Sequence, residues 1–170
     1  METPTVEPNS AMPENPQKEH QWLQKLVGEW TYETEVRMES EHSIEKATGT
    51  EHVRSLGGLW IVAEGQGEMP GCGAATTIMT IGYNPKNQRF MGTWVGSMMT
   101  YLWLYDGELD ASGNSLILYS DGPSMSGEDT LAKYKDVIEL KSNNHRVMTS
   151  HVLNNDGQWH QFMTVNYHRR

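Results

Sequence analysis

Residues 26–30 read LVGEW, and the hydrophobic pattern of the chain changes within this stretch. Before it, apolar residues recur at helical spacing, which predicts a short amphipathic helix over residues 19–26. After Gly28, every second residue from Trp30 to Met38 falls on one face, and charged or polar residues occupy the other. The stretch therefore predicts a short helix that leads directly into a half-buried β-strand.

Similar alternating runs follow to the C-terminus, separated by residues that favour tight turns. The turn signals include Gly57-Gly58, Asp106-Gly107 and Asp156-Gly157. Together with the strand that begins at Trp30, the runs predict roughly ten strands at hairpin spacing. The further predicted strands are residues 47–56, 59–68, 75–83, 88–95, 98–105, 115–120, 130–141, 145–153 and 158–168.

Consecutive antiparallel strands with little helix must bury one face of their sheet against itself. Closure into a barrel achieves this and also removes the unpaired strand edges that promote aggregation. We therefore expect an all-β fold, a single antiparallel up-and-down β-barrel of roughly ten strands with the short helix capping one end. A β-sandwich is the alternative.

The LVGEW stretch has a structural role in such a barrel. A short helix across one opening, followed by a bulky aromatic residue, keeps water out of the core. Trp22 and Trp30 supply the rings, and Gly28 lets the backbone turn closely between them because glycine tolerates unusual φ angles. We assign these three residues to the closure of the barrel end.

Composition and net charge exclude several classes of protein. The chain has 170 residues and a formal net charge of -9, and it has no basic cluster before its terminal arginines. We therefore expect no nucleic-acid partner and no membrane association. It lacks both a spanning segment and a secretory signal, so we expect a cytoplasmic location. Cys72 is the only cysteine, which excludes an intrachain disulfide.

The N-terminal segment differs from the rest of the chain. Residues 1–18 carry four of the seven prolines and few apolar residues, so they cannot offset the entropy cost of ordering. We predict a disordered leader over residues 1–18 and a single barrel domain over residues 19–170. No internal repeat is evident.

Four segments carry a resemblance to a known family. They are LVGEW (26–30), LGGLWIVAEG (56–65), IGYNPKNQRFMGTW (81–94) and VNYHR (165–169). In this order and spacing the chain is similar, over residues 19–170, to a largely bacterial family of proteins of unknown function, DUF1579. The Gly-x-Trp after a short leading helix also resembles lipocalins and other calycins. The resemblance implies a calycin-like barrel, and the family supplies no established activity.

The lipocalin resemblance also implies a partner for Trp30. In lipocalins a basic residue late in the last strand stacks across the motif tryptophan, so Arg169 is expected to form a cation–π contact with Trp30. The alternative is a solvated terminal arginine. The haem-binding nitrobindins share the broader architecture, but the chain lacks the extended glycine-rich opening that follows their Gly-x-Trp. We therefore predict no cofactor.

The seven histidines show no spacing typical of a metal site, and we predict no metal. If Trp159 and Met163 share the core face of the last strand, His160 points to solvent. His151 alternates with apolar residues and is a candidate to face a cavity. An inward Arg54 would anchor a carboxylate or phosphate, and an outward orientation is the alternative.

Eleven methionines and six tryptophans suit an interior that adapts to apolar guests. We therefore predict a binding module, with no catalytic residue, for a small and mainly apolar ligand. One alternative is an enzyme that uses His151 or a rim carboxylate for acid–base catalysis. Another is a filled barrel with a structural role, as in a homo-oligomer. The cavity candidates are Tyr32, Arg54, Met79, Met91, Tyr101, Trp103, His151 and Met163.

Overall fold

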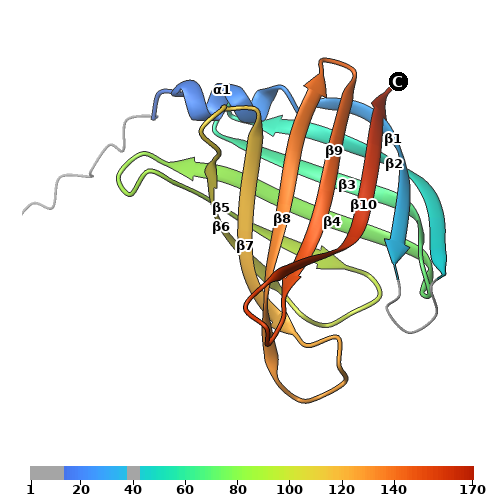
Figure 1. Cartoon of the computed structure of the whole chain (residues 1–170). Coiled ribbons are helices and arrows are strands. Elements are labelled where there is room, and N and C mark those ends of the chain that lie inside the picture. Colours follow the sequence, from blue (N-terminus) through green and yellow to red (C-terminus); the bar gives the residue numbers. More distant parts are fainter. Residues whose placement is uncertain (1–13, 38–42) are drawn as a thin grey trace, which may run out of the picture.

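The computed structural model describes residues 14–37 and 43–170, so most of the predicted leader lies outside the described residues. In this part of the chain, one short helix, α1 (Lys18–Gln24), precedes ten strands (Figure 1). No helix in the described ranges is long and apolar enough to cross a membrane. The strands are β1 (Gly28–Arg37), β2 (Ile44–Leu56), β3 (Trp60–Met69), β4 (Gly73–Asn84), β5 (Arg89–Gly96), β6 (Trp103–Leu109), β7 (Ser115–Pro123), β8 (Leu131–Ser142), β9 (His145–Leu153) and β10 (Trp159–Arg169).

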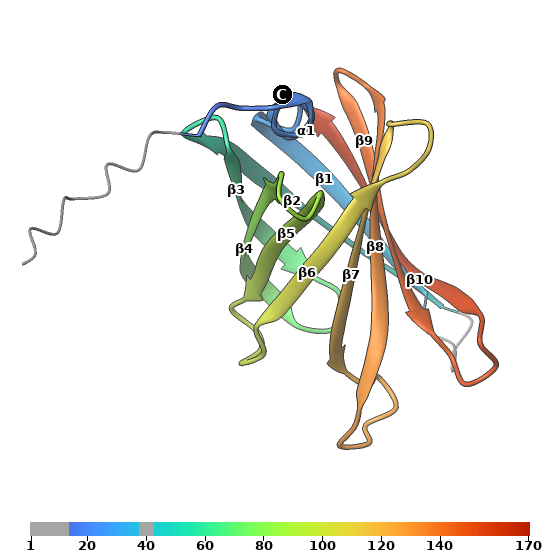
Figure 2. The same ribbon diagram turned by 90° about the vertical axis from the view of Figure 1, so that its left-hand side faces the viewer.

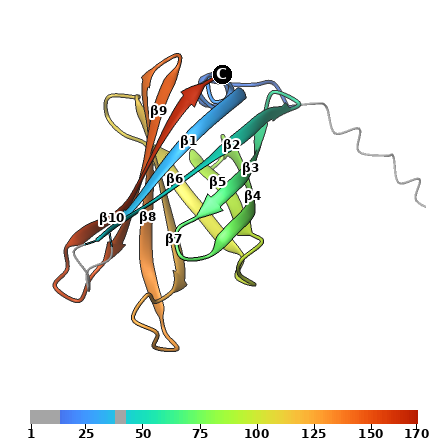
Figure 3. The ribbon, with the colours of Figure 1, turned by 90° about the vertical axis from the view of Figure 1, so that its right-hand side faces the viewer.

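The strands form one closed barrel in which spatial order follows chain order (Figures 1 and 3). All neighbouring strands are antiparallel, and β1 closes the barrel by pairing with β10. In that closing ladder Trp30 lies opposite Arg169, and Val36 lies opposite Met163. The predicted all-β, ten-stranded antiparallel barrel with a short N-terminal helix is confirmed.

The sixth strand differs from its prediction. The sequence predicts a strand over residues 98–105 and a turn at Asp106-Gly107, but β6 continues through both residues to Leu109. Gly107 pairs with β5 on one side and with β7 on the other. A Cβ atom at Gly107 would lie 2.4 Å from the carbonyl oxygen of Ile117, so this glycine permits a close approach of two strands. The prediction of a turn here is wrong.

A β-bulge reverses the faces of β10. The register against β9 shifts between Gln161 and Met163, which leaves Phe162 as the extra residue. Before the bulge, His160 therefore lies on the inner side, and Trp159 packs outside against side chains of neighbouring strands. The prediction that Trp159 shares a face with Met163 is wrong, because strict alternation does not continue through a bulge.

Helix α1 lies across one end of the barrel (Figures 1 and 2). The interior beneath it is tightly filled, and we call this end the plugged end. From the helical segment, Leu23 and Leu26 pack into the same cluster as Trp30, and all three are at most 1% exposed. Trp22 fixes the helix by donating its Nε1–H to the carbonyl of Gly113, at 2.8 Å. The strands contribute Val53, Ile61, Ile81, Phe90, Leu116, Leu118 and Ile138 to this core.

Trp30 is held on several sides. Its Nε1–H donates to the carbonyl of Leu26 at 2.9 Å, and the guanidinium of Arg169 lies over its ring at 4.2 Å. The same guanidinium donates to the carbonyl oxygen of Val27 at 2.7 Å, so Arg169 joins the last strand to the LVGEW segment. Gly28 has φ +139°, and a Cβ atom there would lie 2.2 Å from Arg169 Nη1. Only glycine fits this position without displacing the arginine.

Candidate functional site

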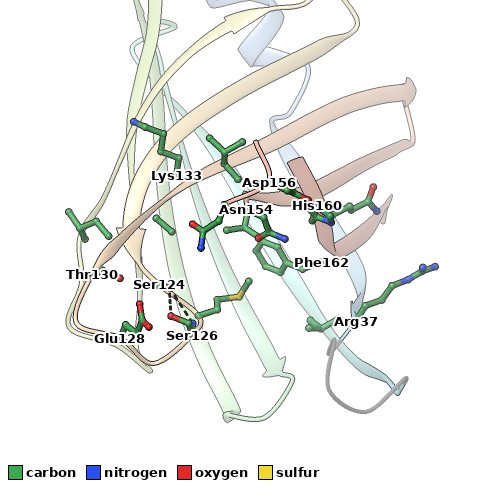
Figure 4. A pocket seen from close by; sticks show the side chains of 18 of the residues that line it. Arg37, Ser124, Ser126, Glu128, Thr130, Lys133, Asn154, Asp156, His160 and Phe162 are labelled. Atoms are coloured by element: carbon green, nitrogen blue, oxygen red, sulfur yellow. Dashed lines mark hydrogen bonds and ion pairs between the residues drawn. The ribbon is translucent and has the colours of Figure 1, made fainter. Parts of the chain in front are cut away.

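The opposite end of the barrel is open. A hollow of about 1400 Å³ lies there between the ends of three hairpins, β1–β2, β7–β8 and β9–β10 (Figure 4). We call this space the mouth hollow. It is lined by residues 36–37, 43–44, 124–126, 128, 130–133, 152–156 and 160–162.

The mouth hollow is apolar at depth and polar at its rim. Val36, Val152 and Phe162 line it from the inner faces of β1, β9 and β10. At the rim, His160 Nε2 lies 3.0 Å from a carboxylate oxygen of Asp156. The backbone N–H of residue 158 and the His160 side chain keep the pKa of Asp156 below its usual value. The hollow can thus accommodate an apolar body while polar groups remain in water.

Strands β6 and β7 separate toward the open end of the barrel (Figure 2), and an aromatic band lines the inner wall there. Only four residue pairs join these two strands. Beyond them, the ring of Trp103 lies directly on Gly122, where a Cβ atom would come within 2.1 Å of the ring. Ring contacts then run from Trp103 to Tyr134 at 5.0 Å and from Tyr134 to Phe162 at 6.2 Å. Side-chain packing thus replaces the missing backbone pairing and extends to the mouth hollow.

Between the mouth hollow and the plugged end, the inner face is incompletely filled. Met79, Trp94, Met148 and Met163 lie on the inner faces of β4, β5, β9 and β10, yet each retains partial exposure. Because these side chains point away from the outer surface, their exposure indicates that solvent enters the barrel above the plug. Tyr32 of β1 lies against the wall over glycines of β2 and β3.

Polar side chains cross the barrel above the plugged end. Arg146, which is only 4% exposed, forms an ion pair with Glu51. Its guanidinium lies 3.9 Å from the ring centroid of Tyr167 and 4.7 Å from that of Trp30. The ring of Trp30 therefore contacts two arginines, Arg146 inside the barrel and Arg169 at the end of β10. We use the name polar layer for six residues: Glu51, Tyr105, Asp136, Arg146, Ser150 and Tyr167.

The other half of the polar layer centres on Asp136. The Tyr105 hydroxyl donates to Asp136 Oδ2 at 2.7 Å. Desolvation raises the pKa of Asp136, although hydrogen bonds from Ser150 and Tyr105 act in the opposite direction. Burial also raises the pKa of Tyr105, and that of Tyr167 is raised by burial and by the carboxylate of Glu51. Both tyrosines thus keep their hydroxyl protons at neutral pH and can act as donors.

The structure divides the predicted cavity residues into two groups. Tyr32, Met79, Trp103 and Met163 lie on inner faces of the barrel. Tyr101 lies in the segment before β6, where its ring packs on Trp103 and its hydroxyl donates to the carbonyl oxygen of residue 121 at 2.9 Å. Ligand contact by these five residues remains a prediction.

Three predicted cavity residues lie on the outer surface. Arg54 follows the buried Val53 in β2 and is exposed. Met91 pairs with Asp106, whose side chain binds Arg89 outside the barrel. His151 lies outside because its neighbours on β9, residues 150 and 152, point inward, and its Nδ1 lies 3.2 Å from the carbonyl oxygen of residue 135. These orientations correct the assignment of Arg54, Met91 and His151 to the lumen.

The polar layer was not predicted from the sequence. In β9 the two faces carry two apolar residues each, so the alternation does not decide between them, and the face with Arg146 and Ser150 is the one that is buried. The one available signal is an arginine that alternates with Met148, a pattern that also occurs on solvated strands. The buried acids of the layer likewise carry no local motif, since their partners lie on distant strands.

Metal chemistry has no candidate centre in the part of the chain that the structure describes. There, no group of three or more histidine, cysteine, aspartate or glutamate side chains is arranged to hold an ion. The stacked pair His145 and His168, with ring centroids 4.6 Å apart, contains only two such groups.

Solved structures with similar folds were compared with the barrel. Rv2717c from M. tuberculosis has a TM-score of 0.62 at 9% identity, with 92% of this chain and 99% of that chain covered. A redesigned β-barrel gives 0.45 at 11% identity, covering 89% and 94% of the two chains. EF1p2_mFAP2b bound to DFHBI gives 0.42 at 15% identity, covering 89% and 98%. At these identities the likeness concerns the fold alone.

Sequence comparison identifies a family. No functionally curated protein matches the chain significantly. The family model for proteins of unknown function DUF1579 matches residues 15–169, nearly the whole of the barrel and its helix. The resemblance inferred from the four sequence segments is thereby confirmed, and the chain belongs to the DUF1579 family.

Proposed function

We propose that this barrel is a non-enzymatic binding protein for a small, mainly apolar molecule. The ligand occupies the mouth hollow and extends along the unfilled inner face toward the polar layer. One observation carries the proposal: large inner-facing side chains stay partly exposed above the plugged end, although the strand residues that fill that end are at most 1% exposed. An inner surface of this kind excludes little water by itself and gains from an apolar guest.

The chemistry of the wall supports an adaptable apolar site. Met79, Met148 and Met163 offer flexible, polarisable side chains that fit irregular shapes. The aromatic band adds flat surfaces at the entrance. The mouth hollow, at about 1400 Å³, exceeds the roughly 300–1000 Å³ of typical ligand sites, because it includes the open entrance.

The test uses N-phenyl-1-naphthylamine, an uncharged probe that becomes fluorescent in apolar surroundings. The wild-type protein is expected to give saturable binding. Met163→Trp fills the inner face between the mouth hollow and the polar layer and is expected to weaken binding at least about tenfold. Met91→Trp makes the same exchange on the outer face and is expected to change the affinity by less than about twofold.

Circular dichroism of both variants controls for folding. A linear, unsaturable fluorescence signal from the wild-type protein would reject the proposal. Equal weakening by the inner and outer substitutions would also reject it, because binding would then not depend on the inner face.

A further inference from the structure

The polar layer contains two donor groups without an acceptor. Arg146 is only 4% exposed, and its Nε–H has no hydrogen-bond partner. Tyr167 is 7% exposed, and among the described residues its hydroxyl has no hydrogen-bond partner either. The two groups are neighbours, since the Arg146 guanidinium lies 3.9 Å from the Tyr167 ring centroid. The Arg146 Nε–H is the buried atom of the two, and buried donors are nearly always paired in folded proteins, so this site calls for an acceptor atom.

Building on the proposed function, we infer that the ligand carries an uncharged hydrogen-bond acceptor, such as the carbonyl of a ketone, ester or amide, which binds at Arg146 and Tyr167. The apolar body of the ligand then lies along the inner face above. The acceptor supplies the missing partner for the arginine Nε–H and the tyrosine hydroxyl.

Charge balance argues against an anionic ligand. Arg146 is the one cation of the polar layer, and Glu51 already pairs with it. Asp136 adds a second acid on the far side. A ligand carboxylate would therefore become the third acid in a layer with one guanidinium, in a region where desolvation penalises charge.

A cationic head group fits no better. It would lie beside the like charge of Arg146, and each acid of the layer already has a donor: Glu51 binds Arg146, and Asp136 accepts from Tyr105. The groups left unpaired are donors. Only an acceptor without charge satisfies both the hydrogen bonding and the charge balance of the layer.

The distance along the barrel sets the size of the ligand. Val36 lines the mouth hollow and Tyr32, four residues further toward the plug on the same face of β1, packs on the ring of Tyr167 at 5.7 Å. At about 3.3 Å per residue, the hollow and the layer are about 13 Å apart. Partly exposed Met148 and Met163 lie along this path. A chain of about ten carbons with a terminal carbonyl spans it.

The experiment compares three competitors of equal chain length for displacement of N-phenyl-1-naphthylamine: 2-undecanone, undecanoate and undecylammonium. The ketone is expected to displace the probe at about tenfold lower concentration than either charged molecule. Tyr167→Phe removes only the hydroxyl and is expected to reduce this preference about three- to tenfold. Tyr119→Phe, the same exchange on the outer face of β7, is the matched control and should leave the preference unchanged.

Arg146→Lys provides a second variant, because it keeps the charge opposite Glu51 but lacks the Nε–H. It too is expected to reduce the preference for the ketone. Equal displacement by the three competitors, or strongest displacement by undecanoate, overturns the inference while the proposed function stands. A preference that survives both Tyr167→Phe and Arg146→Lys overturns it as well. Absence of probe binding by the wild-type protein instead overturns the proposed function, and the inference with it.

Discussion

The plugged end and the open end are built from the same strands but differ in the size of the side chains that point inward. In β7 the inner residues change along the strand from Leu116 and Leu118, both 0% exposed, to Ser120 and Gly122 near the mouth. In β2 the inner Val53 at the plugged end gives way to Gly49 and Ala47 toward the mouth. Large aliphatic residues fill one end, whereas small residues line the other and let the rings of Trp103 and Tyr32 lie directly against the barrel wall.

This difference shows that alternation and filling are separate properties of a barrel strand. Alternation decides which residues point inward, whereas the volume of those residues along the strand decides where the interior is solid. The polar layer lies at the boundary, where Arg146 stacks on Trp30 of the plug and its ion pair with Glu51 faces the open half. Stability and binding are therefore expected to respond to different ends of the molecule.

The largest effect is expected from Trp30→Ala. The substitution removes a fully buried ring and its stacking with two guanidinium groups, so the free energy of unfolding should fall by about 3–5 kcal/mol. Trp94→Ala makes the same exchange in the open half, where the ring is already partly exposed, and should cost about 1–2 kcal/mol. Urea denaturation of both variants measures the two losses.

Equal losses for the two tryptophans would remove the distinction between a filled and an unfilled end. A loss below about 1 kcal/mol for Trp30→Ala would contradict the role of this residue in closing the barrel.

A smaller effect is expected from Gly28→Ala. A Cβ atom would meet Arg169 Nη1, and the backbone has a φ of +139°, so the loss in unfolding free energy should be about 2–3 kcal/mol. Gly113→Ala is the control, because its φ is also positive but no atom lies within 4 Å of the added carbon. That variant should lose about 1 kcal/mol from backbone strain alone.

A double-mutant cycle with Arg169→Ala sharpens this prediction. Without the arginine, the cost of Gly28→Ala should decrease by about 1 kcal/mol, since only backbone strain remains. An unchanged cost would show that contact with Arg169 does not explain why glycine occupies this position.

The smallest effect concerns the pH dependence of the open half. Burial raises the folded-state pKa of Asp136 above its ordinary value of 3.8, so the folded protein binds the proton more tightly than the unfolded chain does. The contribution of Asp136 to stability is then greatest below the unfolded pKa and falls as the pH rises through the folded pKa. Asp136→Asn cannot ionise, and its stability relative to the wild type should therefore rise over that interval.

Asp156→Asn at the rim of the mouth hollow is the control of opposite sign. The pKa of Asp156 is lowered, so its contribution is present above the unfolded pKa and is lost as the pH falls through the folded value. The relative stability of Asp156→Asn should therefore fall as the pH rises. Urea denaturation between about pH 3 and pH 8 measures both slopes, and slopes of the same sign would contradict the burial of Asp136.

Local sequence patterns correctly predicted a closed barrel with a short helix at one end. The change of period at LVGEW, the alternating runs and the turn pairs each reflect interactions between residues close in sequence. The same reasoning misplaced β6 and one end of β10. Asp106-Gly107 has the composition of a turn, but its glycine serves the close contact of two strands, and the bulge at Phe162 exchanges the two faces.

By itself, the sequence determined the number and order of the strands, the helix at one end and the residues that close it. The period-two pattern and the turn residues are local, and closure follows from the need to bury one face. Only the tertiary structure decided which faces of β2, β5 and β9 are inside, and with them the polar layer and the outward positions of Arg54, Met91 and His151. The physical reason is that Arg146 is buried by contacts with Glu51, Tyr167 and Trp30, which lie on three other strands and leave no signal near it in the sequence.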